Sequence, residues 1–584
     1  MFSKAFGKRS YGASRNMRGA ASFAMNRSLV AQSAPVNDQT AFRNMPLLII
    51  PLAFLSVLVC SDNSRAESAP ANNESSTIYS LEEVSKHKTK ATGIWVFYKD
   101  GVYDITKFVA NHPGGQDKIM LAAGGDIAPF WNLYRQHFNS SLPLEILSGL
   151  RIGSLSPEDV RRIQASRAPG DDKDPYSKDP SLSPVMHYLS RKPINAEPPN
   201  SLLTDDWITP TELWFVRNHH PVVKTDADDK NYNISVGGDK TVSSNVGVGS
   251  INLTLEDIKT KFTPHTVIAT LQCGGNRRSE MSAIERTNGS NWSSAISTAK
   301  WKGARLRDIL LAAGVNEEEV LGDGPESGKI KHVHFLGADN MQASIPIKKA
   351  LSRDGEVLIA YEMNDGPIPS QHGHPLRAVV PGHVGVRNVK WLNGIVLSSE
   401  EATGPWQRGM SYKGFGPSVR SLEGIDVEAI PSLQEQPVQS SVTLPYAGVG
   451  VGGIAQVTAG EPLTVKGYAY SGGGRGIIRV DVSIDGGKNW VNADLTEGSS
   501  VSTKQPVNHT QPLDRAWAWT FWECELDIPE EMAGQTLQII SKATDASYNV
   551  QPDSVQGVWN LRGINNNAWP RVTAAVVKSD SDAD

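Results

Sequence analysis

The sequence has few cysteines, only three in 584 residues. Cys60, Cys273 and Cys524 lie far apart, and no two of them have the close spacing of a zinc site or of a small disulfide framework. A disulfide-rich secreted scaffold and a zinc-knuckle protein are therefore disfavoured. Any role for a thiol must be that of a single residue, and a buried inert thiol is the plain alternative at each position.

The chain also lacks a large excess of charge of either sign. Its 57 Lys and Arg residues against 62 Asp and Glu residues leave a net charge of −5 and a pI near 6.3. Such a balance gives no general attraction to nucleic acid, so any binding of anions must come from a local cluster. Hydrophobic residues make up 39% of the chain, and its length is enough for three or four globular domains.

A long uninterrupted hydrophobic run is missing as well. Residues 46–60 are the best candidate, but Pro51 interrupts them, and as a helix they would span roughly 22 Å against a hydrocarbon core of about 30 Å. They follow a basic, serine-rich segment whose only acidic residue is Asp38. This pattern is typical of a mitochondrial presequence with a sorting signal, whereas a disordered basic tail is the alternative. We assign residues 1–75 to targeting and expect delivery to the intermembrane space, with no stable membrane span in the mature protein.

Strand and turn signals begin at residues 76–153. An Asp-Gly pair at residues 100–101 joins two strand-like runs, as in a β-hairpin. Residues 112–115 read His-Pro-Gly-Gly, which stops any helix and presents His112 at a loop. His112 and a second histidine, His137, would suit the two axial positions of a haem iron that carries electrons without binding oxygen. The segment resembles cytochrome b5, which implies an α+β module with haem b held by these two histidines.

Composition divides the rest of the chain. Residues 154–180 are polar, charged and Pro-rich, which predicts a flexible linker; a tether for a mobile haem module and a passive connector are both open. Residues 181–420 mix short strands and helices, which predicts an α+β domain with mixed sheets. Residues 421–575 carry strand and turn signals typical of an antiparallel, immunoglobulin-like all-β sandwich. The acidic tail at 576–584 is expected to be disordered.

The chemically informative residues of the α+β domain lie in short blocks. Residues 271–281 place Cys273 in a glycine-rich turn directly before two arginines. Glycines let the backbone approach a ligand closely, and positive charge beside the thiol favours the thiolate that binds metal. From these residues alone, a nucleophilic or redox-sensing cysteine is the alternative. The histidines that could partner such a thiol are His219, His372 and His383.

These blocks resemble the sulfite oxidase family of molybdenum enzymes, over about residues 76–570. The matching positions, in family order, are Arg217-Asn218-His219, the block that begins at Cys273, Trp292, Asp339, His372-Gly373 with Arg377, and Asn388 to Trp391. The resemblance implies that Cys273 is the protein ligand of molybdenum, since a soft thiolate suits this metal. It also implies a molybdopterin site made of Phe215, Val216, Arg217, Asn218, His219, Cys273, Asp339, His372, Arg377, Asn388, Val389 and Lys390.

By the same resemblance, the catalytic residues line an anion pocket around the metal. They are Arg217, Arg278, Trp292, Tyr412 and Arg562. Guanidinium groups match a small oxyanion such as sulfite through charge-assisted hydrogen bonds, although a lone arginine is more often a surface ion pair. The implied reaction is oxidation of sulfite to sulfate, with electrons passing through the haem to cytochrome c, in a homodimer formed by the C-terminal domain.

Two positions depart from the family pattern. Gly274 stands where the family commonly has Ala, a small change that we expect to be tolerated. Ser411 stands where the family often has Asp, which puts in doubt the role of an acid at that point but not the role of Tyr412.

Two rival functions are left open by the residues. A nitrate-reductase-like molybdenum enzyme is disfavoured because the haem segment comes first and no flavin-binding segment is expected after residue 575. A non-enzymatic haem electron carrier is disfavoured because Cys273 and the arginines are retained.

Overall fold

A computed structural model describes residues 77–578, apart from gaps at 114–115, 134, 139, 166–173, 226–230, 243–247, 324–327, 449–452 and 502–506. The targeting segment predicted at 1–75 and most of the predicted acidic tail lie outside the described residues. Among the described helices, none has the length and apolar character that crossing a membrane requires.

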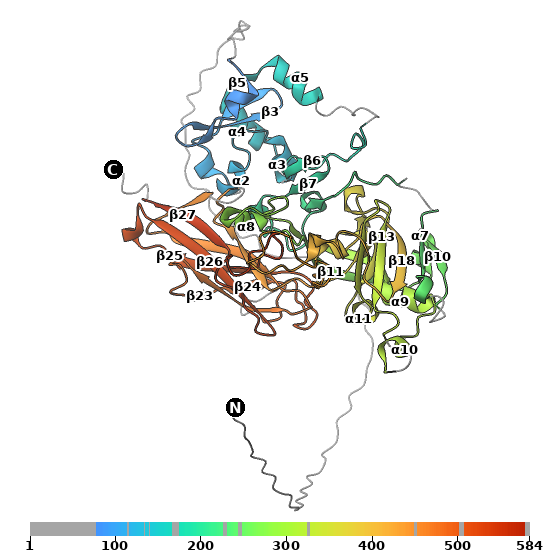
Figure 1. Cartoon of the computed structure of the whole chain (residues 1–584). Coiled ribbons are helices and arrows are strands. Elements are labelled where there is room, and N and C mark those ends of the chain that lie inside the picture. The colour runs from blue at the N-terminus through green and yellow to red at the C-terminus, as the bar shows by residue number, and fades with distance from the viewer. Residues whose placement is uncertain are drawn as a thin grey trace, which may run out of the picture. The chain divides into compact units, whose positions relative to one another are not determined.

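The haem-binding segment forms a small α+β module, drawn at the blue end of the colour range in Figure 1. Its five-stranded sheet has the order β1-β5-β4-β3-β2. The predicted Asp-Gly hairpin joins β3 and β4, in which Tyr98 lies opposite Gly101. The elements are β1 (Ile78–Tyr79), α1 (Leu81–Val84), β2 (Lys88–Thr89), β3 (Gly93–Tyr98), β4 (Gly101–Asp104), α2 (Gln116–Met120), α3 (Ala128–Leu133), α4 (Leu142–Gly149), β5 (Arg151–Leu155) and α5 (Pro157–Ala165).

The bounds predicted for the linker, residues 154–180, are wrong at both ends. Strand β5 runs to Leu155, and Val160 and Ile163 of α5 pack against the buried cluster that Leu155 belongs to. The apolar residues of α5 lie three apart, so they share one face of a helix and give this polar segment a core contact. At the other end, the Asp179 carboxylate accepts the backbone N–H of Val222 at 2.9 Å.

The next domain contains three β-sheets with helices, as the mixed pattern predicted. The sheets have the orders β10-β9-β18-β13-β14, β11-β12-β15-β16 with β17 paired to β15, and β6-β7-β8; β18 and β9 run parallel. The strands are β6 (His187–Arg191), β7 (Ile194–Glu197), β8 (Val216–Arg217), β9 (Asn233–Gly238), β10 (Ile251–Thr254), β11 (Pro264–Gln272), β12 (Ile296–Arg305), β13 (His332–Gly337), β14 (Gln342–Pro346), β15 (Leu358–Met363), β16 (Gly366–Pro367), β17 (Arg377–Val379) and β18 (Leu392–Ser398). The helices are α7 (Leu255–Thr260), α8 (Arg278–Ile284), α9 (Leu306–Ala312), α10 (Glu317–Leu321) and α11 (Ile347–Leu351).

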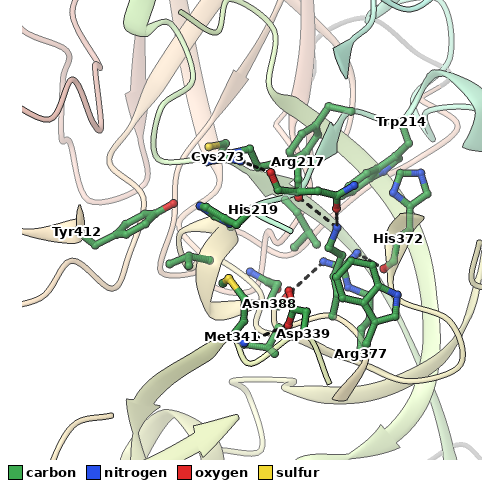
Figure 2. A pocket seen from close by; sticks show the side chains of 18 residues that line it. Trp214, Arg217, His219, Cys273, Asp339, Met341, His372, Arg377, Asn388 and Tyr412 are labelled. Carbon is green, nitrogen blue, oxygen red and sulfur yellow. Dashed lines mark hydrogen bonds between the residues drawn. The ribbon is translucent and has the colours of Figure 1, made fainter. Parts of the chain in front are cut away.

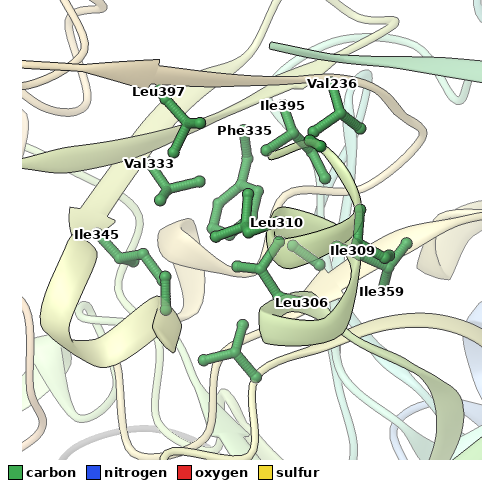
Figure 3. Close-up of a cluster of buried hydrophobic side chains, with 14 of the residues drawn as sticks. Val236, Leu306, Ile309, Leu310, Val333, Phe335, Ile345, Ile359, Ile395 and Leu397 are labelled. Carbon is green, nitrogen blue, oxygen red and sulfur yellow. The ribbon is translucent and has the colours of Figure 1, made fainter. Parts of the chain in front are cut away.

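Helix α9 forms because its apolar residues fall on one face. Leu306, Ile309 and Leu310 follow the i, i+3, i+4 spacing of an amphipathic helix, and all three are fully buried. They belong to the same buried cluster as Phe335 of β13 and Ile395 of β18 (Figure 3). This core fixes one sheet of the domain and, through it, the loops that carry polar residues.

The C-terminal domain is all-β, with two sheets of orders β19-β21-β25-β24 and β20-β27-β26-β22-β23. The pairing is not wholly antiparallel as predicted, because β20 and β27 run parallel. The strands are β19 (Gln439–Leu444), β20 (Ile454–Thr458), β21 (Pro462–Tyr470), β22 (Ile477–Ser483), β23 (Val491–Asn492), β24 (Asp494–Glu497), β25 (Thr520–Asp527), β26 (Thr536–Asp545) and β27 (Arg571–Val577).

Candidate active site

Cys273 lies at the end of a long, well-paired strand. Strand β11 pairs with β12 along its whole length, down to Gln272 opposite Ile296. The Cys273 backbone N–H then donates to the Ala295 carbonyl at 3.0 Å. The Gly275 N–H donates to the Cys273 sulfur at 3.4 Å, and the side chain is buried. The sheet therefore fixes where the thiol points.

The Cys273 side chain lines a pocket that Figure 2 shows from close by. Figure 2 shows Cys273 and Tyr412 toward one end and Trp214, His372 and Arg377 toward the other. Of the predicted cofactor residues, the lining includes Phe215, Arg217, Asn218, His219, Cys273, Asp339, His372, Arg377, Asn388, Val389 and Lys390. Val216 is buried in β8 beside this group and does not line the cavity.

Six lining residues were not predicted as site residues from the sequence: Trp214, Leu271, Met341, Gly385, Val386 and Trp391. Apolar and glycine residues give no chemical signal of their own in a sequence. Met341 could have been found from its position, because its backbone N–H donates to the predicted Asp339 carboxylate at 3.1 Å.

Lys390 joins two of the predicted blocks. Its ammonium donates to the carbonyls of Arg217 at 3.1 Å and Gln371 at 2.8 Å, and to the side-chain oxygen of Asn218. Burial lowers the pKa of Lys390 well below its usual value, and the neighbouring Arg377 guanidinium lowers it further. An ammonium group in this position is stabilised by an anion beside it.

Arg377 is a second buried cation at the same end. It donates to the His372 carbonyl at 2.8 Å and to the Asn388 carbonyl at 3.2 Å. Burial lowers the pKa of its guanidinium to about 9. Burial also lowers the pKa of His372, and that of His219 to about 2, with nearby cations adding to both effects. Both imidazoles are therefore neutral hydrogen-bonding groups at pH 7.

Several buried polar atoms around the cavity find no hydrogen-bond partner in the described part of the chain. Those at the Arg377 end are Trp214 Nε1, Asn218 Nδ2, His372 Nε2 and Arg377 Nε. Buried donors are nearly always satisfied, so such a cluster indicates a missing ligand with many acceptor atoms. Buried cations and unpaired donors together fit a phosphate-bearing, acceptor-rich cofactor such as molybdopterin.

Two of the five predicted catalytic residues, Arg217 and Tyr412, line the cavity, and the other three lie outside its lining. Tyr412 lines the cavity, and burial raises the pKa of its hydroxyl, an effect that Cys273 strengthens, so the phenol stays protonated. Burial lowers the pKa of Arg278, while Cys273 and Tyr412 oppose that shift, so these groups lie within electrostatic range of one another. Arg217 and Arg562 are the other cations that act on Arg278.

Trp292 and Arg562 complete this group. The Trp292 ring is fully buried, and its carbonyl accepts the Ser279 backbone N–H at 3.3 Å. Trp292 Nε1 and Arg562 Nε are again without a partner within the described residues. Arg562 comes from the C-terminal domain, and its carbonyl accepts a hydrogen bond from Arg278 Nε at 3.1 Å. The five predicted catalytic residues therefore come together from two domains.

Glu197 is a supporting residue that the sequence did not reveal. It is 2% exposed, and its carboxylate accepts the backbone N–H groups of Ser293, at 3.0 Å, and Ser294, at 2.7 Å. These two residues directly follow Trp292, so Glu197 fixes the segment that carries the tryptophan. Burial raises the pKa of Glu197 to about 7.

The second site is an apolar pocket in the haem module. His112 and His137 line it with rings 6.2 Å apart between centroids and 9° from parallel. An iron between them, with metal–nitrogen bonds of about 2 Å, fits this separation. The remaining lining residues are Val96, Ile105, Phe108, Pro113, Ile119, Ala122, Ile127, Phe130, Trp131, Leu142, Pro143, Ile146, Leu147 and Leu150. An apolar slot with two facing imidazoles suits a bis-histidine haem.

Comparison with known families matches all three folded parts. Residues 80–156 match the cytochrome b5-like haem/steroid binding domain, residues 219–406 the oxidoreductase molybdopterin binding domain, and residues 431–577 the Mo-co oxidoreductase dimerisation domain.

Curated relatives cover most of the chain. Mitochondrial sulfite oxidase of Rattus norvegicus is 45% identical over 87% of this chain and 86% of its own length. Sulfite oxidase of Gallus gallus is 45% identical over 84% of this chain and 99% of its own length. The mitochondrial sulfite oxidase of Drosophila melanogaster is 40% identical over 85% of this chain and 81% of its own length.

Among solved structures, the sulfane dehydrogenase SoxCD of Paracoccus pantotrophus aligns with a TM-score of 0.51. It is 24% identical, over 70% of this chain and 93% of that one. This similarity concerns the fold alone.

Proposed function

The chain belongs to the sulfite oxidase family, and from that premise we propose that it oxidises sulfite to sulfate beside Cys273. The observation that carries the proposal is a cluster of three arginines around that thiol, one of them buried and two half-buried. Arg217, Arg278 and Arg562 supply fixed positive charge where a small dianion would bind. Guanidinium donors in a desolvated pocket bind such an oxyanion far more strongly than they would in water.

The residues at the other end of the cavity would hold the molybdenum cofactor. Lys390, Arg377 and His372 would meet its phosphate and pterin, and Cys273 would be the protein ligand of the metal. Within the described residues, no group of three or more His, Cys, Asp or Glu side chains could hold a metal ion, so the other ligands would come from the cofactor. When bound, the cofactor supplies oxygen-atom transfer and takes up two electrons.

The chain's own residues would bind and orient the substrate. Arg278 and Arg562 would neutralise the anion, and the protonated Tyr412 hydroxyl would donate a hydrogen bond to an oxygen of sulfite or sulfate. Buried Trp292 would close the pocket and exclude water. Ser411 offers no carboxyl group for proton transfer, so the proposal assigns Tyr412 and the arginines the whole of this role.

His112 and His137 would hold haem b, which would supply one-electron transfer toward an acceptor such as cytochrome c. A bis-histidine iron has no open position, so it suits electron transfer rather than oxygen chemistry. The mitochondrial relatives support a mitochondrial enzyme, and the basic residues 1–45 followed by a short apolar run support the intermembrane space. The dimerisation domain at 431–577 supports a homodimer.

One experiment tests the function directly. The purified protein would be assayed for molybdenum and haem, and then for reduction of cytochrome c by sulfite. We expect both cofactors and a sulfite-dependent rate. Nitrate reduction in place of sulfite oxidation would support a nitrate-reductase-like enzyme, and haem without molybdenum would support a haem electron carrier.

A further inference from the structure

The guanidinium group of Arg278 is held on several sides by backbone. Its Nε donates to the carbonyls of Arg562 at 3.1 Å and Gly563 at 2.8 Å. Its Nη1 donates to the Ser290 carbonyl at 2.8 Å. Two segments far apart in sequence therefore clamp one side chain, which is only 8% exposed.

Three glycines lie so close to Arg278 that no side chain would fit at their positions. A Cβ atom on Gly275 would lie 2.6 Å from Nη2, one on Gly289 would lie 2.5 Å from Nη1, and one on Gly563 would lie 2.6 Å from Cγ. Real Cβ atoms essentially never approach another heavy atom closer than 3.0 Å. The lack of a side chain at each of these three positions therefore makes room for Arg278.

Gly289 differs from the other two glycines because its closeness to Arg278 is the one feature that explains a glycine at this position. Gly563 has a φ of +59°, which favours glycine by itself, and Gly275 lies in the turn beside Cys273. Gly289 is exposed and its φ lies outside the left-handed region, yet the three atoms nearest its missing Cβ all belong to Arg278. An exposed loop position with an ordinary backbone would otherwise accept many residues.

The loop that carries Gly289 is anchored on both sides of the glycine. The Asn288 backbone N–H donates to the Leu561 carbonyl at 3.0 Å, and the Thr287 hydroxyl bonds that of Ser282 at 2.7 Å. The Ser290 carbonyl is itself the acceptor for Arg278. A methyl group at position 289 would therefore displace the arginine more readily than the loop.

We propose that Gly289 is a positioning residue, which acts on the bound oxyanion through Arg278. Because position 289 has no side chain, the 287–290 loop can hold the Arg278 guanidinium against the pocket. The inference deepens the proposed function, because it concerns how the substrate arginine is held. A displacement of about 1 Å in such a group costs up to about a hundredfold in rate. Gly289 would thus set the affinity for sulfite without touching it.

The test is the variant Gly289→Ala in the full-length holoenzyme, with Gly416→Ala as a matched control. Gly416 is also exposed, has no positive φ and has no heavy atom within 4 Å of its missing Cβ. We expect Gly289→Ala to raise the KM for sulfite about tenfold or more with a smaller change in kcat. The dissociation constant of sulfate, measured by calorimetry, should rise in parallel. Gly416→Ala should leave both constants unchanged.

A double-mutant cycle identifies the group through which Gly289 acts. Arg278→Lys removes the planar head that the methyl group would strike. In that background, Gly289→Ala should change KM and the sulfate constant less than about twofold, since the two changes act on one contact. The combined variant also serves if Gly289→Ala alone folds poorly, because removal of the clash should then restore its thermal midpoint.

Two results would overturn the inference. One is a Gly289→Ala enzyme with the same KM and the same sulfate affinity as Gly416→Ala. The other is a pair of effects that simply add in the cycle, which would mean that Gly289 acts elsewhere. Sulfate binding is measured without turnover, so a protein that fails to oxidise sulfite would refute the proposed function and still decide whether Gly289 holds Arg278.

Discussion

The two pockets of this chain bind their groups by opposite physical means. The haem pocket is lined almost wholly by apolar side chains, with His112 and His137 as its polar residues. The cavity beside Cys273 has apolar and aromatic walls too, but it adds cations, imidazoles and amides, and several of their buried nitrogen atoms have no partner among the described residues. Filling the haem pocket buries apolar surface, whereas filling the polar cavity satisfies buried donors and charge.

This difference affects how each pocket depends on its ligand. Unpaired buried donors cost roughly 1–3 kcal/mol each, so loss of the cofactor should destabilise the catalytic domain. The haem module would lose metal bonds and the apolar contacts of a cluster that lines its pocket, but the separate cluster around Val84 and Leu155 would keep its packing. The predictions below test whether the two regions are as independent as this contrast implies.

The largest expected effect comes from Cys273→Ala. It removes the proposed metal ligand, and the rate of sulfite oxidation should fall by more than about a hundredfold, beyond what loss of a mere supporting residue costs. The haem absorbance spectrum should not change, since His112 and His137 lie in the other module. Cys524→Ala, a matched change at a buried cysteine of β25, should keep its activity. An equal loss of activity in Cys273→Ala and Cys524→Ala would contradict the assignment of Cys273 as the metal ligand.

The next effect tests the apolar pocket. His137→Ala should abolish tight haem binding and lower cytochrome c reduction by at least about tenfold, because one axial bond is gone. Reduction of ferricyanide, if it takes electrons directly at the metal, should persist. His87→Ala is the control, since His87 belongs to the same module and stacks on Trp95 away from the haem pocket. Loss of both activities would mean that the two pockets are coupled.

The haem pocket could be predicted from sequence because its signals are local. A four-residue His-Pro-Gly-Gly motif and one hairpin turn fixed the module and one ligand. The α5 helix could not be predicted in the same way, because its polar surface hides two apolar residues whose burial depends on Leu155. Composition reports the exposed face of such a helix and misses the buried one.

The polar cavity is less predictable because it is assembled from distant segments. Cys273 was singled out by its glycine-rich turn, but Arg377 and Lys390 were recognised only through resemblance to a family, since no local rule brings the three together. Glu197 was missed because a lone Glu at the end of a short strand is ordinary in sequence. Its structural role depends on hydrogen bonds from two backbone N–H groups nearly a hundred residues away, at Ser293 and Ser294.

A smaller effect should appear in the pH dependence of stability. Burial raises the pKa of Glu197 from 4.5 to about 7, so between these values the folded chain holds a proton that the unfolded chain has lost. The free energy of unfolding should therefore fall as pH rises from about 4.5 to about 7, by about 3 kcal/mol, and then level off. Glu197→Gln should remove this fall.

Tryptophan fluorescence during thermal unfolding would follow mainly the catalytic and C-terminal domains, which hold most of the tryptophans, and the haem absorbance band would follow the haem module. We expect the pH effect of Glu197→Gln in the fluorescence transition and little change in the haem transition. An unaltered pH profile in the variant would show that the Glu197 carboxyl is ionised in the fold at neutral pH.

The smallest effect is expected at Gly274, where the family commonly has Ala. A Cβ atom there would lie 3.0 Å from the Tyr412 ring, so the ring would need to move by only a few tenths of an ångström. Tyr412 packs with apolar neighbours that can absorb such a shift, and mild overpacking of this kind is tolerated far better than a cavity or a lost ligand. Gly274→Ala should change kcat for sulfite by about twofold or less. A much larger loss in kcat, with normal molybdenum content, would mean that the Tyr412 ring is held too tightly to make this shift.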